Sequence, residues 1–218
     1  MITVSESIQN IVRESPLLEE GLALGIINLS ALARRIRPQV EIQLLKPVSD
    51  SAVMMALKRL SEHIQKTSRL QAKFLKGMGD MTVRSSLSEF TFQISDTILE
   101  KEKQLLHEIA GQRDRFVTFT QGLFEITVIV SSDLEKSVEV VFAKEKLIAK
   151  LNGLSAIILK LPAATVHMPG IHYSILKQLA WDNINVIEEV STYTEYTIII
   201  EKNQVDRAFS ILKGFLWP

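Results

Sequence analysis

The sequence predicts an α+β protein in which an all-helical N-terminal domain precedes two β-α-β-β-α-β units in tandem. Three observations lead to this prediction. Residues 1–79 carry helix signals and no strand pattern, alternating apolar segments begin after residue 80, and the order of strands and helices in residues 80–161 recurs in residues 162–218. We therefore divide the chain into domains 1–79, 80–161 and 162–218.

The composition is typical of a globular protein, with 46% hydrophobic and 23% charged residues. No apolar run approaches the roughly 20 residues needed to cross a bilayer, and the first residues lack the pattern of a signal peptide. We therefore expect a cytoplasmic protein with no membrane contact. Cysteine is absent, which excludes disulfides, thiolate metal sites and cysteine nucleophiles.

The net charge of zero is the sum of a positively charged N-terminal part and a negatively charged C-terminal part. Residues 1–79 hold 11 Lys/Arg against 7 Asp/Glu, a net of +4, and residues 80–218 hold 14 against 18, a net of −4. Within the first part, residues 28–79 hold 10 basic and 3 acidic residues, a net of +7. Such a local excess of positive charge is what contact with phosphate groups would need.

Helix signals follow one another through the first domain. Ser5–Glu14 comes first, and Ser15 and Pro16 then form an N-cap and a first helical position. The helix LSALARRI should break or kink at Arg37-Pro38, because proline disfavours helical geometry in the preceding residue. A cleaner helix is expected from Ser49 to about Gln65, and Gln71–Asp80 reads as a linker.

In the Ser49–Gln65 helix, three- and four-residue spacing turns Val53, Leu57 and Leu60 inwards and leaves Met54, Lys58, Ser61, Glu62 and Gln65 outside. This segment resembles the second helix of a helix-turn-helix unit, and LSALARRI resembles the first. The resemblance implies DNA contacts from Ser51, Met54, Lys58 and Arg59.

Two features count against DNA binding. The segment RPQVEIQLLKP makes the connection longer than a tight turn, and the outward positions offer no Arg or Asn pair for base edges. The partner of residues 28–79 is therefore either duplex DNA or a protein.

Strands and helices alternate after residue 80. The first unit reads as strand LSEFTFQI, a helix over Asp96–Ala110, strands RFVTFT and FEITVIV, a helix from Asp133 and strand LSAIILKLP. The second reads as strand AATVHM, a helix over Ile171–Trp181, strands INVIEEV and YTEYTIII, and a helix over Val205–Leu212, with room for a short last strand in FLWP. Exposed sheet edges in such units favour a homodimer.

The Pro169-Gly170 pair lies directly between an apolar segment and the Ile171–Trp181 helix. Glycine can adopt positive φ, and a helix N-terminus offers free N–H groups and a positive dipole end. This arrangement suits a carboxylate or another small anion. A plain turn into the helix is the alternative.

The segments MPGI, LA, NINV, ST, TE and TIII of this second unit resemble the ACT domain, a ferredoxin-like amino-acid-binding regulatory module. The two units together resemble the paired ACT region of aspartokinase. No glycine-rich nucleotide loop of the GxxxxGK[ST] kind is present, so a kinase domain is not expected.

The resemblance implies a free amino acid as effector, held between neighbouring ACT units by the loop after the first strand and by residues entering the second. Asn183 stands where the family commonly has glycine, and asparagine tolerates a left-handed turn. In the first unit the corresponding loop QISDTIL lacks glycine, and Asp96 would repel a carboxylate, so its role should be structural. The implied ligand-binding residues are Met168, Pro169, Gly170, Ile171, Asn183, Ile184 and Asn185.

No catalytic constellation can be assembled from this sequence. His63, His107, His167 and His172 have no metal-ligand spacing, and no GxSxG elbow is present. We therefore expect a protein without enzymatic activity, metal or cofactor. The first hypothesis is an amino-acid sensor that regulates transcription, and the alternative is a stand-alone regulatory partner of a biosynthetic enzyme such as aspartokinase.

Overall fold

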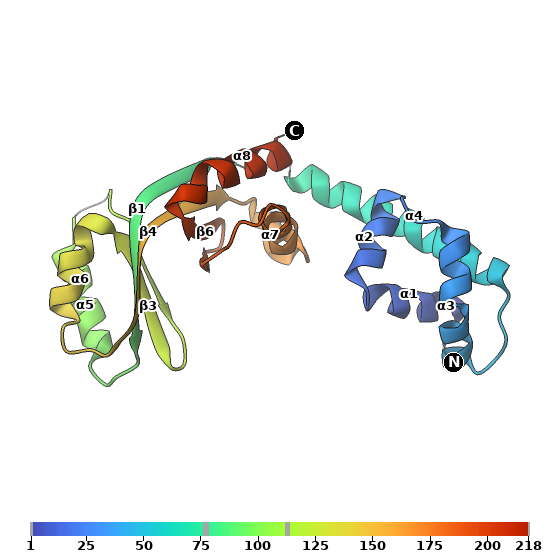
Figure 1. Cartoon of the computed structure of the whole chain (residues 1–218), viewed down its shortest axis with the longest axis horizontal. Coiled ribbons are helices and arrows are strands. Elements are labelled where there is room, and N and C mark those ends of the chain that lie inside the picture. The colour runs from blue at the N-terminus through green and yellow to red at the C-terminus, as the bar shows by residue number, and fades with distance from the viewer. Residues whose placement is uncertain (1, 76–78, 112–113, 218) are drawn as a thin grey trace. The chain divides into compact units, whose positions relative to one another are not determined.

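The computed structural model describes residues 2–75, 79–111 and 114–217, which fold as two units, Met1–Phe74 and Leu75–Pro218 (Figure 1). The N-terminal unit is helical, as predicted. Capping bonds start two of its helices: Thr3 and Glu6 form a capping box, and the Asn28 side chain accepts from the N–H of Ala31 at 3.0 Å. The helices are α1 (Val4–Arg13), α2 (Pro16–Leu24), α3 (Leu29–Leu44) and α4 (Asp50–Leu75).

The predicted break at Arg37-Pro38 and the predicted helix end near Gln65 are wrong. Helix α3 continues through Pro38, which lies on its exposed face, while Ile36 and Val40 are buried in the core. Burial of this side of the helix outweighs the intrinsic cost of an internal proline, about 3 kcal/mol. Helix α4 runs on to Leu75 instead of ending near Gln65. The segment RPQVEIQLLKP is therefore mostly helical, and only Leu45–Ser49 connects α3 to α4.

The outward face predicted for α4 is partly wrong. Ser61 is 7% exposed, and its Oγ donates a hydrogen bond of 3.1 Å to the carbonyl of Leu22. The same carbonyl accepts from Nε2 of Gln65 at 3.1 Å. The carbonyl of Leu22 also accepts from the N–H of Gly25 at 3.2 Å, so the two side-chain bonds from α4 add to the backbone bond at the end of α2. Met54 packs against the core instead of pointing outwards.

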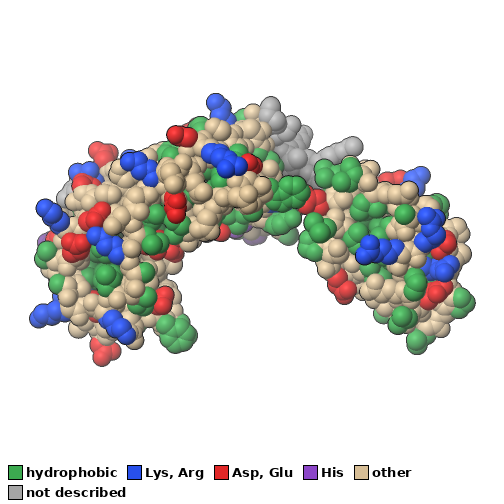
Figure 2. All heavy atoms as spheres, viewed as in Figure 1, with side chains coloured by type: hydrophobic (Ala, Val, Ile, Leu, Met, Phe, Trp, Pro, Cys, Tyr) green, Lys and Arg blue, Asp and Glu red, His purple; other side chains and the backbone are tan. Residues whose placement is uncertain are grey.

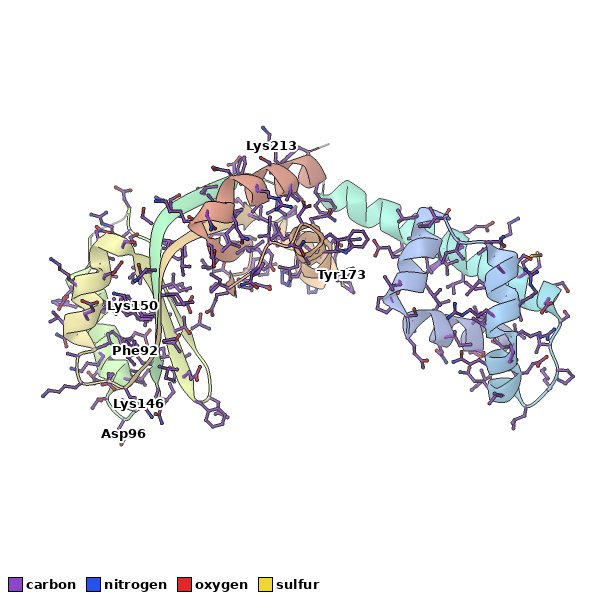
Figure 3. All side chains as sticks on the ribbon, in the orientation of Figure 1. Phe92, Asp96, Lys146, Lys150, Tyr173 and Lys213 are labelled. Atoms are coloured by element: carbon purple, nitrogen blue, oxygen red, sulfur yellow. The ribbon has the colours of Figure 1, made fainter. Side chains whose placement is uncertain are left out.

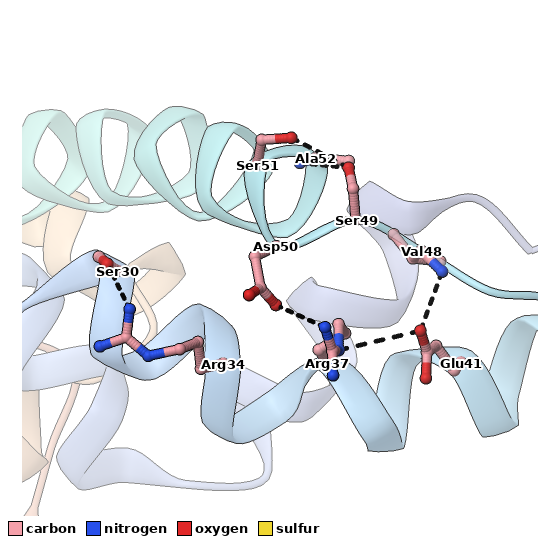
Figure 4. Close-up of polar contacts among 9 residues, drawn as sticks. All are labelled: Ser30, Arg34, Arg37, Glu41, Val48, Ser49, Asp50, Ser51 and Ala52. Atoms are coloured by element: carbon pink, nitrogen blue, oxygen red, sulfur yellow. Dashed lines mark hydrogen bonds and ion pairs between the residues drawn. The ribbon is translucent and has the colours of Figure 1, made fainter.

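Charged side chains hold the connection between α3 and α4 in place (Figure 4). Arg37 pairs with Asp50 at 3.1 Å, and Oε1 of Glu41 accepts from the N–H of Val48 at 3.0 Å. Ser49 Oγ accepts from the N–H of Ala52 at 3.2 Å, which confirms its predicted role as a cap.

The C-terminal unit is built on one six-stranded antiparallel sheet with strand order β2-β3-β1-β4-β6-β5. Helices follow the strands in the order β1-α5-β2-β3-α6-β4-α7-β5-β6-α8. The strands are β1 (Met81–Gln93), β2 (Val117–Gln121), β3 (Glu125–Ser131), β4 (Leu147–Lys160), β5 (Glu188–Ser191) and β6 (Glu195–Glu201). The helices are α5 (Ile98–Glu108), α6 (Glu135–Val141), α7 (Ile171–Trp181) and α8 (Val205–Leu216), with short 3-10 turns η1 (Ser132–Leu134), η2 (Ala163–His167) and η3 (Lys202–Gln204).

Two predicted strands are absent from the described residues of this unit. AATVHM contains the 3-10 turn η2, because the N–H and the hydroxyl of Thr165 both bond to the carbonyl of Pro162, at 2.9 and 2.6 Å. FLWP forms no strand, since α8 continues to Leu216. The first strand of the C-terminal half is instead the second part of β4. In the prediction from sequence this segment, LSAIILKLP, belongs to the preceding unit.

Strands β1 and β4 each serve both halves of the sheet. The second part of β1 pairs with β3, and the second part of β4 pairs with β6. Residues 81–85, at the start of β1, pair with residues 155–159 of β4 and so form the fourth strand of the C-terminal half. Residues 147–151, at the start of β4, pair with residues 89–92 of β1 and so form the fourth strand of the other half. Figure 1 shows these two strands bending as they pass from one half to the other.

A residue with positive φ marks the passage in each strand. Ser86 in β1 has φ 60° and Gly153 in β4 has φ 70°, and the pairing register shifts beside Ser86. Such bulges bend a strand and increase its twist. The bend divides the helix-covered face into two cores, one around Phe90, Phe92 and Phe142 under α5 and α6, and one around Ile157 and Tyr196 under α7 and α8.

The other face of the sheet carries its own apolar cluster, which joins the two halves. Leu87 and Ile129 pack there with Leu154, Ala156 and Ile199, all at most 2% exposed. Glu89, two residues after Leu87 in β1, is 6% exposed, and its Oε2 has no hydrogen-bond partner among the residues that the structure describes. Burial first, and the charge of Glu188 second, raise the pKa of Glu89 to about 7, and burial also raises the pKa of Glu188.

We predict that Ser86→Gly stabilises the protein by up to about 1 kcal/mol, because glycine relieves the left-handed conformation. Ser85→Gly is the matched control, since Ser85 is also exposed but pairs regularly with Ser155. That variant should lose roughly 0.5–1 kcal/mol. Guanidinium unfolding of both variants measures the change in the free energy of unfolding, which should be positive for Ser86→Gly and negative for Ser85→Gly. A loss of stability in Ser86→Gly as large as that in Ser85→Gly would contradict the strain described at Ser86.

We also predict that stability falls as pH rises from about 4.5 to about 7, because the native Glu89 carboxyl holds its proton more tightly than the unfolded one. Glu89→Gln should remove this loss, giving a gain of roughly 2 kcal/mol at pH 8 and little change at pH 4. Urea unfolding at both pH values measures it, with the exposed Glu125→Gln as control. Equal effects of Glu89→Gln at the two pH values would show that the carboxyl does not titrate as described.

Candidate functional site at the start of helix α7

The loop of the predicted ligand site leads from η2 into α7. Gly170 is the N-cap of α7 with φ 83° and ψ 4°, so the predicted positive φ is confirmed. No described side chain caps this helix end, and free N–H groups are expected in its first turn. A Cβ added at Gly170 would meet no atom within 4 Å. The backbone here is therefore open to a small molecule.

A pocket of about 530 Å³ lies against this loop. It brings together three of the predicted site residues, Met168, Gly170 and Ile171, with the first turn of α7 and the β5–β6 hairpin. The hairpin is held beside the loop by the N–H of Leu161, which donates to the carbonyl of Thr194 at 2.7 Å. The lining residues are Leu161, Thr165, Val166, Met168, Gly170, Ile171, His172, Tyr173, Ser191, Thr192, Tyr193 and Glu195.

The hairpin side of the pocket was not predicted from sequence. Ser191, Thr192, Tyr193 and Glu195 line it. The segments ST and TE belong to the ACT resemblance, but none of these four is among the predicted ligand-binding residues. Their proximity depends on the pairing of β4 with β6, whose register places Lys160 opposite Glu195. The sequence predicted the two strands of this hairpin, but not that the hairpin lies beside the loop into α7.

The other predicted group lies at the far end of α7. Asn183 has φ 53°, which confirms the predicted left-handed turn, while Ile184 is buried in the core and Asn185 is exposed. An 11-residue helix spans about 16 Å, and none of these three residues lines the pocket. One copy of this half therefore does not bring Met168–Ile171 and Asn183–Asn185 into a single site.

The aromatic side chains near the pocket include one buried tyrosine and two exposed ones. Tyr196 is 1% exposed, donates through its hydroxyl to Oε2 of Glu189 at 2.5 Å and stacks on the ring of His172 with centroids 4.4 Å apart. Burial, together with the bond to Glu189, raises the pKa of Tyr196 well above its usual value. Tyr173 and Tyr193, which line the pocket, are 54% and 67% exposed, and Figure 3 shows Tyr173 extending from α7.

The predicted DNA-contacting residues do not form one exposed set. Lys58 and Arg59 are exposed on α4 and Ser51 is exposed at its start, but Met54 packs against the helical core. Figure 2 shows lysine and arginine side chains on the visible face of this unit, interspersed with acidic and apolar ones. DNA binding by this unit stays a prediction from sequence.

No catalytic or metal-binding constellation appears in the described part of the chain. No three His, Asp or Glu side chains within it lie close enough together to hold a metal ion. Glu188 and Glu189 point to opposite faces of the sheet, as their positions in a strand predict: one faces Glu89 and the other bonds to Tyr196. Nor does any helix in these residues combine the length and apolar character that spanning a bilayer requires.

Comparison with known proteins identifies the fold. No protein-family model and no curated protein sequence matches the chain. Among solved structures, the regulatory subunit of aspartate kinase from Thermus thermophilus is similar, with 12% identity and a TM-score of 0.52 over 63% of this chain and 97% of that chain. The same subunit from Thermus flavus gives 13% identity and a TM-score of 0.53 over 63% and 97%.

Whole aspartate kinases are similar over a smaller share of their length. Escherichia coli aspartokinase III, solved in complex with lysine and aspartate, is 11% identical with a TM-score of 0.50 over 65% of this chain and 33% of that chain. Identities this low show a shared fold alone. The similarity gives no support to the prediction of transcriptional regulation. It does confirm the predicted resemblance: the chain contains the fold of the regulatory part of aspartate kinase.

Proposed function

We propose that the protein is a non-catalytic regulatory protein that binds a free amino acid at the start of α7. We further propose that the two halves of its sheet are a pair of ACT-like units. The observation that carries this proposal is Gly170, whose left-handed backbone exposes the amides of the first turn of α7 on the wall of a pocket. The shared fold with aspartate kinase regulatory subunits supports it.

The pocket is complementary to a zwitterion. The N-terminus of α7 would hold the carboxylate through its amides and dipole. The Glu195 carboxylate and the faces of Tyr173 and Tyr193 line the same pocket and would attract an ammonium group. Its volume of about 530 Å³ is within the range of roughly 300–1,000 Å³ for small-molecule sites. Aspartokinase III, which shares the fold, has been solved with lysine and aspartate bound.

A second copy would complete the site. Because Asn183 and Asn185 lie at the opposite end of α7 from Gly170, they would reach an effector only from a neighbouring unit. The ACT resemblance implies such sharing and therefore a homodimer. The effector would act by favouring the arrangement in which both units contact it, since only differential affinity can shift a population.

We predict that one or a few related amino acids raise the melting temperature of the purified protein when each of the twenty is added at millimolar concentration. A ligand at 100 times its dissociation constant adds about 2.7 kcal/mol, which corresponds to roughly 5–11 °C for a chain of this size. Differential scanning fluorimetry measures the shift. If none of the twenty raises the melting temperature, the pocket does not bind a free amino acid.

Gly170→Val should abolish this response, because a Cβ at this position obstructs the approach of the carboxylate. The matched control is Gly153→Val. Gly153 also has a positive φ, 70°, and no atom within 4 Å of an added Cβ, but it does not line the pocket. Both variants should melt at lower temperature than the wild type, since valine is strained at positive φ. Only Gly153→Val should keep the amino-acid shift.

A second candidate is a regulatory partner of an amino-acid biosynthetic enzyme such as aspartokinase. The observation that favours it is the coverage of 97% of two aspartate kinase regulatory subunits. We predict that the tagged protein, purified gently from its native cells, brings one biosynthetic enzyme with it in a defined ratio. Mass spectrometry of the eluate identifies that enzyme. Recovery of duplex DNA fragments that dissociate with salt, and no enzyme, would favour the transcriptional alternative instead.

A further inference from the structure

Helices α5 and α7 are each the first helix after the strand that begins its half of the sheet. The second part of β1 pairs with β3 as the second part of β4 pairs with β6, and in each half the next residue bonds to the following hairpin. The N–H of Ile94 donates to the carbonyl of Phe124 at 2.9 Å, and the N–H of Leu161 donates to that of Thr194 at 2.7 Å. Helix α5 then starts at Ile98, whereas α7 starts at Ile171, after the turn η2.

A carboxylate of the protein itself lies at the start of α5. Glu145 accepts hydrogen bonds from Oγ of Ser95 at 2.6 Å and from Oγ1 of Thr97 at 2.7 Å. Thr97 is the N-cap residue of α5, so the negative charge lies near the positive end of the helix dipole. The bond from Ser95 lowers the pKa of Glu145. Figure 3 labels Asp96 and Lys146, the neighbours of these residues, at one end of the sheet.

The equivalent position in the other half has no side chain. The N–H of Gln93 donates to the carbonyl of Lys146, and the N–H of Lys160 donates to that of Asp80, both at 3.0 Å. Asp80 therefore corresponds to Lys146, and the residue before it, Gly79, corresponds to Glu145. Glycine cannot supply a carboxylate as Glu145 does, and no side chain of the described residues caps the start of α7.

The pockets of the two halves differ in the same way. The pocket at α7 includes Gly170, Ile171, His172 and Tyr173 from the helix start. A pocket beside the β2–β3 hairpin is lined partly by Gln93, Ile94 and Lys146, but no residue from Ser95 onwards in the loop or in α5 lines it. The pocket includes the helix start in the C-terminal half and not in the other half.

We propose that Glu145 takes, at α5, the place that an effector carboxylate takes at α7, so that each chain has one effector site. The proposal rests on the proposed function for the effector itself. One part of the proposal does not depend on the effector: the loop Ser95–Thr97 forms a carboxylate site that Glu145 fills permanently. The loop at α5 is then held in its ligand-bound form whatever the effector concentration, and only the C-terminal half responds.

Chemical rescue tests this assignment. Glu145→Ala should melt about 3–8 °C below the wild type, because two charge-assisted hydrogen bonds are lost. Sodium propionate at 0.2 M should recover at least half of that fall, and sodium chloride at the same concentration should not. Glu139→Ala is the matched control, since Glu139 is also a carboxylate at a salt bridge, to Lys150 at 2.9 Å, but makes no contact with the α5 loop.

The readout is the propionate shift of Glu145→Ala minus that of the wild type. Any shift in the wild type reports binding at α7, so a failure of the proposed function leaves this difference unaffected. A propionate shift of Glu145→Ala no larger than that of the wild type or of Glu139→Ala overturns the proposal.

Glu145→Gln keeps the test possible if the alanine variant does not fold. The amide retains one acceptor and the size of the side chain but not the charge. Because the pKa of Glu145 is lowered in the folded protein, its contribution to stability is present at neutral pH and disappears as pH falls below the usual range of a carboxyl. Glu145→Gln should therefore melt below the wild type at pH 7, and the difference should shrink as acid protonates Glu145 in the wild type. Equal melting temperatures at pH 7 would also overturn the proposal.

Discussion

The reciprocal pairing of β1 with β4 is the constraint on which the rest of the C-terminal unit depends. Each strand supplies the first strand of one half and the fourth strand of the other, so neither half has a complete sheet by itself. Ser86 and Gly153 allow both strands to bend at the same level. The bend separates the two helix-covered cores and lets the opposite face close on itself around Leu87 and Leu154.

Two nearly equivalent halves have acquired different chemistry on this shared frame. The loop into α7 contains a glycine at positive φ and opens into a pocket, whereas the loop into α5 is bonded to Glu145. The two halves also differ in the hydrogen bonding of one buried serine in the first strand of each half. Ser88 donates to Glu135, which is paired with Lys150, and the position that corresponds to Ser88 in the other half is Ser155, whose buried hydroxyl has no hydrogen-bond partner in the described residues. The strand pairing is the same in both halves, whereas the residues at the starts of α5 and α7 differ.

Much of this architecture could be predicted from sequence, because local patterns determine it. Period-two alternation located β3 and β6, and the caps at Ser15-Pro16 and Ser49 located helix starts. The errors share one cause, which is that tertiary contacts decided the outcome. Packing of Ile36 and Val40 carries α3 through Pro38, and the Leu22 carbonyl draws Ser61 inwards. The fourth strand of the C-terminal half comes from residues 81–85, which no reading of the last segment could reveal.

The candidate site, too, could be predicted from the sequence only where local patterns determine it. Gly170 and its neighbours were found because a glycine before a helix is a local signal with a physical meaning, and the left-handed Asn183 was found for the same reason. The hairpin residues Tyr193 and Glu195 join the pocket only through the pairing of β4 with β6. The Glu145 carboxylate is 50 residues from Ser95 in sequence. Its role could be seen only once the two halves could be compared position by position.

The reciprocal strands also affect the order in which the protein can fold. During synthesis, residues 81–85 emerge early, yet their partners 155–159 come later and β6 later still. Pairings between residues so far apart in sequence carry a high loop-closure cost and slow folding. Until residues 155–159 have been synthesised, the start of β1 remains an unpaired strand that other chains could join. Arg84, near the end of that segment, places a charge on the exposed strand and so discourages such association.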